Sequence, residues 1–179
     1  FEIATGNPDV VATDSFSTVF GKKLLDMAYD NKKICAVTAA MKYGTGLQYF
    51  HKALPRRFFD VGIAEQHAET FCAGLASDGM IPVFAVYSTF LQRSYDQLMH
   101  DLAIMGTHAV IGVDRAGIVG EDGETHQGIF DYTYLSGIPN MHICAPKNKW
   151  ELSDMMKFAV ALDAPIAVRY PRGTAYAGL

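Results

Sequence analysis

An acidic side chain within the stretch 60–68, Glu65, has apolar neighbours, and a protonatable group there could act on a ligand. Glu65 falls in the expected first turn of a helix, beside Ile63 and Ala64. One interpretation is an acid placed to gain from the helix dipole. The other is a desolvated carboxyl group, which can hold or share a proton with a ring nitrogen of a ligand.

An aromatic residue and a cation follow in the stretch 87–97. Phe90 is positioned to stack on a flat heterocycle. Arg93, one turn later, either binds an anion or pairs with Asp96 or Asp101. The alternative assigns Phe90 to the core and Arg93 to a surface ion pair.

A glycine-rich stretch at 114–128 contains one histidine, and a loop this long inside a compact domain is usually functional. His126 is a candidate general acid/base or oxyanion partner, and Arg115 a candidate clamp for phosphate or carboxylate. The alternative is a solvent loop with an incidental histidine. Arg169 and Arg172 flank a proline and form either a surface pair or a second phosphate ligand.

Short apolar runs precede these clusters and alternate with amphipathic stretches. Continuous apolar runs are typical of strands buried on both faces, and their alternation with helices predicts a parallel sheet. We therefore expect an α/β fold, a three-layer αβα arrangement with a mostly parallel sheet of about six strands. Ligands of such sheets bind beyond the carboxyl ends of the strands, where the clusters lie. The expected strands are 34–38, 58–61, 81–86, 109–114, 141–145 and 165–169, and the expected helices are 15–29, 64–77, 89–104 and one that starts after Asn148.

Composition narrows the class of protein. The 179 residues suffice for one domain, which we place at 14–179 after a tail or linker at 1–13. The net charge of -4 and the lack of a basic run argue against nucleic acid, and no apolar stretch is long enough to span a membrane. The three cysteines lie in apolar runs, which indicates reduced thiols and a cytoplasmic protein. No spacing typical of a metal site occurs.

The clusters, in this order, resemble the pyrimidine-binding domain of the transketolase-like thiamine-diphosphate enzymes, from about Asp14 to Gly173. The stretches 62–68, 87–97, 114–117 and 169–173 resemble the deoxyxylulose-phosphate synthase group within them. The loop around His126 is shared more widely with transketolases. For the cofactor thiamine diphosphate, the resemblance implies that Glu65 contacts the pyrimidine N1′ and Phe90 stacks on that ring. Ile63 and Arg93 would lie nearby.

The same resemblance implies the substrates pyruvate and glyceraldehyde 3-phosphate, joined with loss of carbon dioxide to give 1-deoxy-D-xylulose 5-phosphate. His126 would handle protons or hold a developing alkoxide. Tyr87, Arg115 and Arg172 would take the acceptor's phosphate, with Asp122 beside them. The product would serve the synthesis of isoprenoid, thiamine and pyridoxal precursors.

Two features depart from the family pattern. Ala39 stands where the family commonly has proline. The chain lacks the Gly-Asp-Gly motif through which the family holds Mg²⁺ and the diphosphate. The similar run Gly120-Glu121-Asp122-Gly123 lies in the histidine loop, and Asn148 downstream is expected to cap a helix. We therefore expect Mg²⁺ ligands in a separate diphosphate-binding domain, and neither tight cofactor binding nor turnover by this chain alone. A C-terminal domain is also expected elsewhere.

The sequence also predicts an oligomeric state and leaves two alternative functions open. Small residues on the 64–77 helix suit a close homodimer interface. The first alternative is a subunit of a split transketolase or of a related 2-oxoacid dehydrogenase. The second is a non-catalytic α/β binding module.

Overall fold

The structure of the chain is a computed structural model that describes residues 14–178. Six strands form one sheet, in the order β2-β1-β3-β4-β6-β5, and every neighbouring pair is parallel. This confirms the expected parallel sheet, and each expected strand lies within one residue of its expected bounds. The strands are β1 (Ile34–Thr38), β2 (Phe58–Asp60), β3 (Ile81–Tyr87), β4 (Val110–Asp114), β5 (His142–Cys144) and β6 (Ile166–Arg169).

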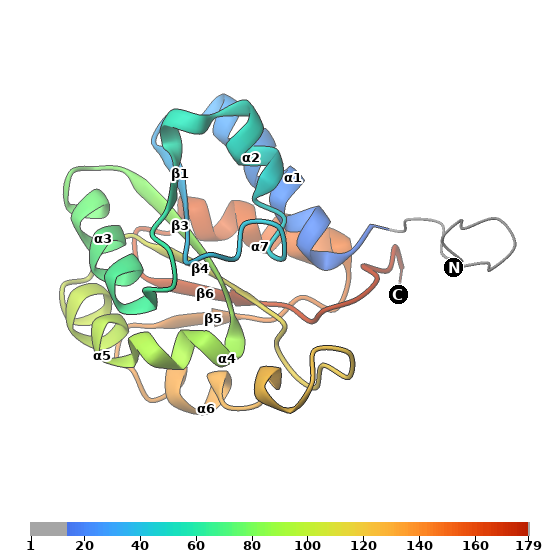
Figure 1. Cartoon of the computed structure of the whole chain (residues 1–179). Coiled ribbons are helices and arrows are strands. Elements are labelled where there is room, and N and C mark those ends of the chain that lie inside the picture. Colours follow the sequence, from blue (N-terminus) through green and yellow to red (C-terminus); the bar gives the residue numbers. More distant parts are fainter. Residues whose placement is uncertain (1–13, 179) are drawn as a thin grey trace, which may run out of the picture.

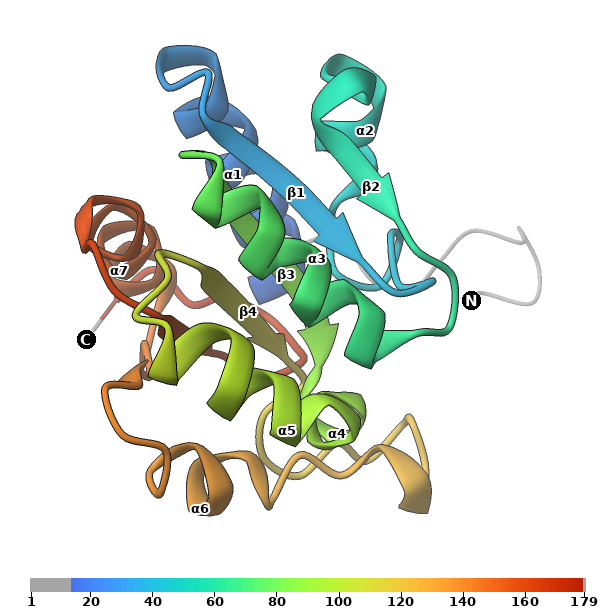
Figure 2. The ribbon, with the colours of Figure 1, turned by 90° about the vertical axis from the view of Figure 1, so that its left-hand side faces the viewer.

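Helices cover both faces of the sheet, which confirms the three-layer arrangement. Helices α1, α2 and α7 lie on one face, and α3, α4, α5 and α6 lie on the other (Figures 1 and 2). The α-helices are α1 (Phe16–Asp30), α2 (Gln48–Ala53), α3 (Glu65–Ser77), α4 (Ser88–Leu91), α5 (Tyr95–Gln97), α6 (Asp131–Leu135) and α7 (Lys149–Ala161). Three 3₁₀ turns occupy Pro55–Arg57, Gln92–Ser94 and Glu124–His126, and a π-helical stretch runs over Leu98–Ile104.

Successive side chains of the strands enter the two apolar cores in turn, as the alternation of a strand requires. In β3, Val83 packs toward α1 and α7, whereas Phe84 packs toward α3. In β4, Gly112 leaves room for the ring of Phe20 from α1, since a Cβ built there would lie 2.5 Å from that ring. Phe20 is fully buried, which stabilises the fold by roughly 1.5–3 kcal/mol.

The expected helix starts are correct at both ends of the chain. Ser15 caps α1 by accepting from the Thr18 backbone nitrogen at 3.1 Å, and Asn148 caps α7. The single helix expected at 89–104 is wrong. It breaks into α4, a 3₁₀ turn, α5 and the π-helical stretch, because the buried Ser94 hydroxyl donates to the Leu91 carbonyl oxygen at 3.0 Å. Helices α2 and α6 were not expected from the sequence.

Other expectations meet the structure as follows. Cys35, Cys72 and Cys144 are free thiols, and burial raises the pKa of Cys35 to about 12, against a smaller opposing effect of Arg57. No helix between residues 14 and 178 has the length and apolar character needed to cross a membrane. In the same range, no three His, Cys, Asp or Glu side chains gather in a way that could hold a metal ion. The tail or linker expected at 1–13 lies outside the described residues.

The strand order reverses direction twice. The chain passes from β1 outward to β2 and then returns to β3 on the other side of β1; likewise it leaves β4 for the outer β5 and returns to β6. At such a reversal the connections depart to opposite faces, which leaves a crevice at the carboxyl ends of the two strands. The stretches 87–97, 114–128 and 169–173 follow β3, β4 and β6 beside these crevices, and the stretch 60–68 follows β2, the neighbour of β1.

Candidate functional site

A cavity of about 330 Å³ lies at the first reversal, where segments from three strand ends meet. Its wall is mostly apolar, with one acid and one cation. Its lining residues are Ala39, Ala40, Met41, Ile63, Glu65, Tyr87, Phe90 and Arg93. The structure thus brings together the residues that the sequence assigned to cofactor binding.

Glu65 is the first residue of α3 and is only 2% exposed. The guanidinium of Arg93 faces its carboxyl group, with Nη1 at 3.3 Å from Oε2 and 3.5 Å from Oε1. A pairing of Arg93 with Asp96 or Asp101 is therefore wrong, and both of these acids have other partners. Glu65 begins a helix and is buried at a cavity wall, whereas its sharing of a proton with a ligand stays a prediction.

Phe90 connects the acid to the histidine loop. Its half-buried ring lies 5.9 Å from the Tyr87 ring at an interplanar angle of 24°, and 5.2 Å from the His126 ring, edge to face. The Arg93 guanidinium carbon lies 5.4 Å from the Phe90 ring centre. Glu65 and Phe90 therefore line one cavity, and His126 reaches it only through its contact with the Phe90 ring.

Asp60 organises the backbone beneath this cavity, and sequence reasoning missed it. Its Oδ1 accepts from the backbone nitrogens of Ala40 at 2.8 Å and of Gly62 at 3.1 Å. Ala40 has a φ of 62°, in the left-handed region where a Cβ costs roughly 1–2 kcal/mol. The signal was present, because an Asp two residues before a Gly is typical of a turn closed by its own side chain.

The loop that carries His126 is closed by its own hydrogen bonds. The backbones of Gly117 and Gly128 exchange bonds of 2.7 and 2.8 Å, and the Gln127 side chain bonds both backbone groups of Val119. His126 ends a 3₁₀ turn, and its Nδ1 lies 2.9 Å from the Thr125 hydroxyl. Gln127 was not singled out from the sequence, yet it fixes the loop that presents the histidine.

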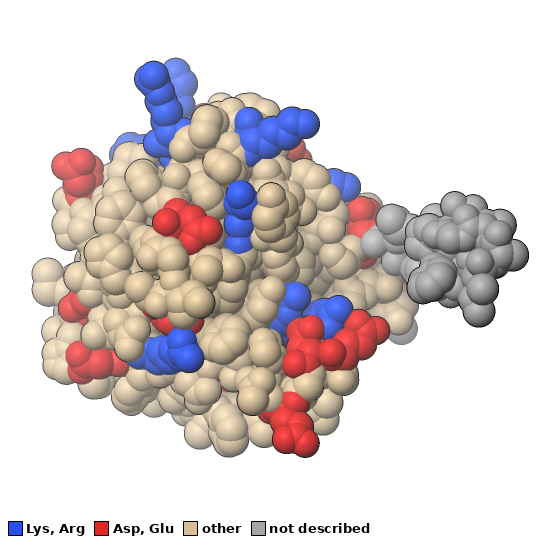
Figure 3. Space-filling model, viewed as in Figure 1, with Lys and Arg blue, Asp and Glu red and all other residues tan. Residues whose placement is uncertain are grey.

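Arg115 and Arg172 meet at the second reversal, beside a cavity of about 420 Å³ that both help to line. The Arg115 guanidinium carbon lies 3.7 Å above the Tyr87 ring, and its Nε donates to Asp122 at 2.8 Å. Arg172 also pairs with Asp122, and its Nη2 contacts Glu121 at 2.8 Å. Acidic and basic side chains adjoin on the surface beside this loop (Figure 3). The four residues expected at the acceptor's phosphate thus form one contact network, with Asp122 at its centre.

Two further contacts fix Arg115. Its Nη1 donates to the Gly44 carbonyl oxygen at 2.9 Å and to Asp114 Oδ1 at 3.0 Å. Asp114 is fully buried, and burial raises the pKa of its carboxyl group to about 6, against the opposing effects of the Ser17 hydroxyl and Arg115. The sequence indicated no role for Asp114 or for Ser17.

Arg169 is not a second phosphate ligand. Its Nε and Nη2 bind the two carboxylate oxygens of buried Asp131 at 2.9 and 3.1 Å. This bidentate pair ties β6 to α6 and uses the donors that an anion would need.

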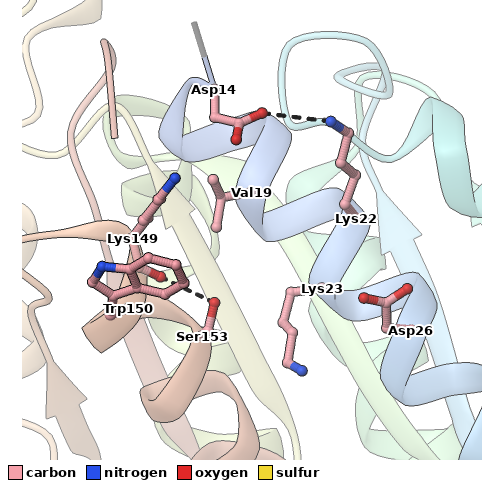
Figure 4. A pocket seen from close by; sticks show the side chains of 8 residues that line it. All are labelled: Asp14, Val19, Lys22, Lys23, Asp26, Lys149, Trp150 and Ser153. Atoms are coloured by element: carbon pink, nitrogen blue, oxygen red, sulfur yellow. Dashed lines mark hydrogen bonds and ion pairs between the residues drawn. The ribbon is translucent and has the colours of Figure 1, made fainter. Parts of the chain in front are cut away.

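A third cavity, of about 220 Å³, lies between α1 and α7 (Figure 4). Lysine side chains and Trp150 line it, and Lys22 reaches Asp14 at 3.5 Å. None of the residues with an expected role lines this cavity, so it lies apart from the two crevices.

Comparisons with known proteins agree with this geometry. Residues 13–176 match the family described as "Transketolase, pyrimidine binding domain". The chain is 59% identical over 175 residues to a 1-deoxy-D-xylulose-5-phosphate synthase of Caldanaerobacter subterraneus subsp. tengcongensis, covering 98% of this chain and 28% of that protein. It is 57% identical over 173 residues to one of Clostridium kluyveri, covering 97% and 28%. The chain thus spans between a quarter and a third of the length of these relatives.

Solved structures share the fold. A split-gene transketolase, described as an inactive β4 tetramer, superposes with a TM-score of 0.81 at 26% identity, covering 94% of this chain and 55% of that one. A transketolase from Leishmania mexicana superposes with a TM-score of 0.81 at 19% identity, covering 95% and 27%. Sequence and fold lead to one conclusion: the chain belongs to the family of transketolase pyrimidine-binding domains.

Proposed function

We propose that this chain is the pyrimidine-binding part of a thiamine-diphosphate-dependent 1-deoxy-D-xylulose-5-phosphate synthase. The enzyme would condense pyruvate, with loss of carbon dioxide, with glyceraldehyde 3-phosphate. The observation that carries the proposal is the buried Glu65 carboxyl group in the wall of a cavity that Phe90 also lines. The named relatives at 57–59% identity support the choice of reaction.

The first cavity fits an aminopyrimidine ring. Its apolar wall suits the ring faces, and its one buried acid suits a ring nitrogen that takes up a proton. When bound, thiamine diphosphate supplies the acidic thiazolium carbon at which the donor carbonyl reacts. The ligands for Mg²⁺ and the diphosphate are proposed to come from another domain.

Four residues of this cavity have proposed roles at the cofactor. Glu65 holds or shares a proton at the pyrimidine N1′, and its burial keeps water from competing for that proton. Arg93 balances the carboxylate charge from 3.3 Å. Phe90 stacks on the ring, and Ile63, which is 78% exposed, supplies an apolar contact at the rim.

The second crevice takes the acceptor. Arg115, Arg172 and Tyr87 bind its phosphate, and Asp122, which now accepts from both arginines, gives up these donors to the dianion. His126, in edge contact with Phe90, serves the proton transfers at the acceptor's carbonyl oxygen.

We also propose a cytoplasmic homodimer. The free thiols support the compartment. Small residues on α3, among them Ala73 and Gly74, leave room for close contact with a second copy of the chain and support the dimer. The split-transketolase alternative has less support, because the split-gene transketolase is 26% identical to this chain and the synthases are 57–59% identical.

The experiment uses the assembled enzyme, with this chain joined to a diphosphate-binding domain and supplied with Mg²⁺ and thiamine diphosphate. Glu65→Gln keeps the size of the side chain but removes the acid. We expect the hydrogen–deuterium exchange at the thiazolium carbon of the bound cofactor, followed by NMR, to slow at least about 100-fold.

The matched control is Glu124→Gln, a change at an exposed acid of the histidine loop, which should leave the exchange unchanged. An unaltered exchange rate in the Glu65 variant would remove this residue from its role and with it the proposed function.

A further inference from the structure

The guanidinium of Arg115 has two carboxylate partners of different kinds. Asp122 lies in the loop 115–128 and is shared with Arg172. Asp114 ends β4, is fully buried, and accepts a 2.7 Å hydrogen bond from Ser17 of α1, which lies 97 residues earlier in the chain. An incoming anion can replace the first partner, whereas the second is held by the sheet and by α1.

Three of the five N–H donors of Arg115 have an acceptor. Nε binds Asp122, and Nη1 binds the Gly44 carbonyl oxygen and Asp114. Within residues 14–178, no group accepts from Nη2. The Arg115 side chain is 10% exposed and lines the 420 Å³ cavity, so Nη2 is the donor left for a ligand there.

The position of Arg115 also requires support. Its backbone φ is 61°, which is unfavourable for a residue with a Cβ. Its guanidinium carbon lies 3.7 Å from the centre of the Tyr87 ring, and Tyr87 also lines the first cavity. The contact with Asp114 therefore fixes a side chain that starts from an unfavourable backbone.

We propose that Asp114, held by Ser17, is a positioning residue that fixes Arg115 so that its Nη2 and Nε groups meet the acceptor's phosphate. Asp114 touches neither cofactor nor substrate and acts only through Arg115. The inference rests on the proposed function, because it concerns the specificity of that site for a phosphorylated acceptor.

The test compares two acceptors in the assembled enzyme, glyceraldehyde 3-phosphate and unphosphorylated glyceraldehyde. We expect Asp114→Asn to raise the KM for the phosphorylated acceptor about tenfold, with kcat and the kcat/KM for unphosphorylated glyceraldehyde within about twofold. Ser17→Ala, which changes no charge, should raise the same KM about threefold.

The sign of the effect is decisive. If Asp114 were only a negative charge near an anion, its removal would lower the KM for the phosphorylated acceptor. An unchanged or lowered KM, or equal losses with both acceptors, would overturn the proposal.

A second measurement does not depend on turnover. Inorganic phosphate is titrated into this chain while the arginine Nε–H signals are followed by NMR. Arg172→Ala, which lacks one of the two arginines proposed to bind phosphate, serves as the reference for weakened binding. We expect weaker phosphate binding by both positioning variants. If the wild-type chain binds phosphate but the assembled enzyme is inactive, the proposed function fails and the positioning role stands. Phosphate that does not bind the wild-type chain, or binds the variants equally or more tightly, refutes the positioning role.

Discussion

Two carboxyl groups, one helical turn apart on α3, have opposite surroundings. Glu65 faces Arg93, whereas Glu69 is fully buried and neither of its oxygens has a hydrogen-bond partner among the described residues. Burial, and secondarily the charge of Asp101, raises the pKa of Glu69 to about 8. Glu69 is therefore mostly protonated at neutral pH.

The raised pKa of Glu69 predicts a pH dependence of stability. Between about pH 4.5 and 8 the folded chain keeps a proton that the unfolded chain releases, so the free energy of unfolding falls as the pH rises through this window. The slope from this group is at most about 1.4 kcal/mol per pH unit. Glu69→Gln is neutral at every pH and should flatten the slope, as measured by urea unfolding at several pH values.

Glu124→Gln, at an exposed acid, serves as the control and should leave the profile unchanged. A profile for Glu69→Gln that parallels the wild type would contradict the assignment.

At the scale of single residues, the sequence indicates a role only where the residue type itself suggests the chemistry. Glu65, Phe90 and His126 stand out by residue type, and the structure places Glu65 and Phe90 in one cavity, with the His126 ring against Phe90. The burial of Glu69 and the contact between Ser17 and Asp114 depend on elements distant in the chain, so no local pattern could indicate them.

At the scale of the elements, two helices contain an interior glycine in contrasting surroundings. A Cβ at Gly21 of α1 would lie 2.0 Å from the carbonyl oxygen of Gly46, whereas a Cβ at Gly74 of α3 would meet nothing within 4 Å. Gly21 therefore allows α1 to approach the turn near Gly46, and α1 carries the Ser17 that holds Asp114.

Matched alanine substitutions should have opposite effects on the stability of this chain. Gly21→Ala forces α1 away from a backbone group and should cost about 1–3 kcal/mol. Gly74→Ala adds a better helix former in open space and should stabilise by about 0.5–1 kcal/mol. Chemical denaturation measures both, and effects of the same sign would show that the packing around Gly21 is not close.

Sequence periodicity predicts helices that have a capping residue and an apolar stripe, as α1 and α7 do. It fails for the segment between Ser88 and Ile104, where a buried serine and a π-helical stretch interrupt an apparently continuous helix. It also fails for the short helices α2 and α6, which have too few turns to show a period.

At the scale of the whole molecule, the alternation of strands and helices predicts a parallel sheet but not the order of its strands. The observed order matters for the candidate site, because it places both reversals next to the predicted clusters. The resemblance to a known family supplied the roles of these clusters.

The arrangement of the molecule predicts the behaviour of the chain by itself. If this chain supplies only one wall of the cofactor site, as proposed above, we expect it to release no carbon dioxide from pyruvate and glyceraldehyde 3-phosphate, even with Mg²⁺ and thiamine diphosphate added. Addition of a diphosphate-binding domain from a close relative should restore release. The measurement is a coupled carbon dioxide assay, and turnover by the chain alone would contradict the expected division of the site.

The first crevice lies between β1 and β3 and the second between β4 and β6, so two strand spacings separate their centres. Neighbouring strands are about 4.8 Å apart, so the centres of the crevices are separated by about 10 Å. If a flat ring binds in one crevice and an anion in the other, as proposed above, the backbone hydrogen bonds of the sheet set the distance between the strand ends that carry their binding residues. Changes of a single side chain would then alter how tightly each group is held, whereas the spacing between the two crevices would stay the same.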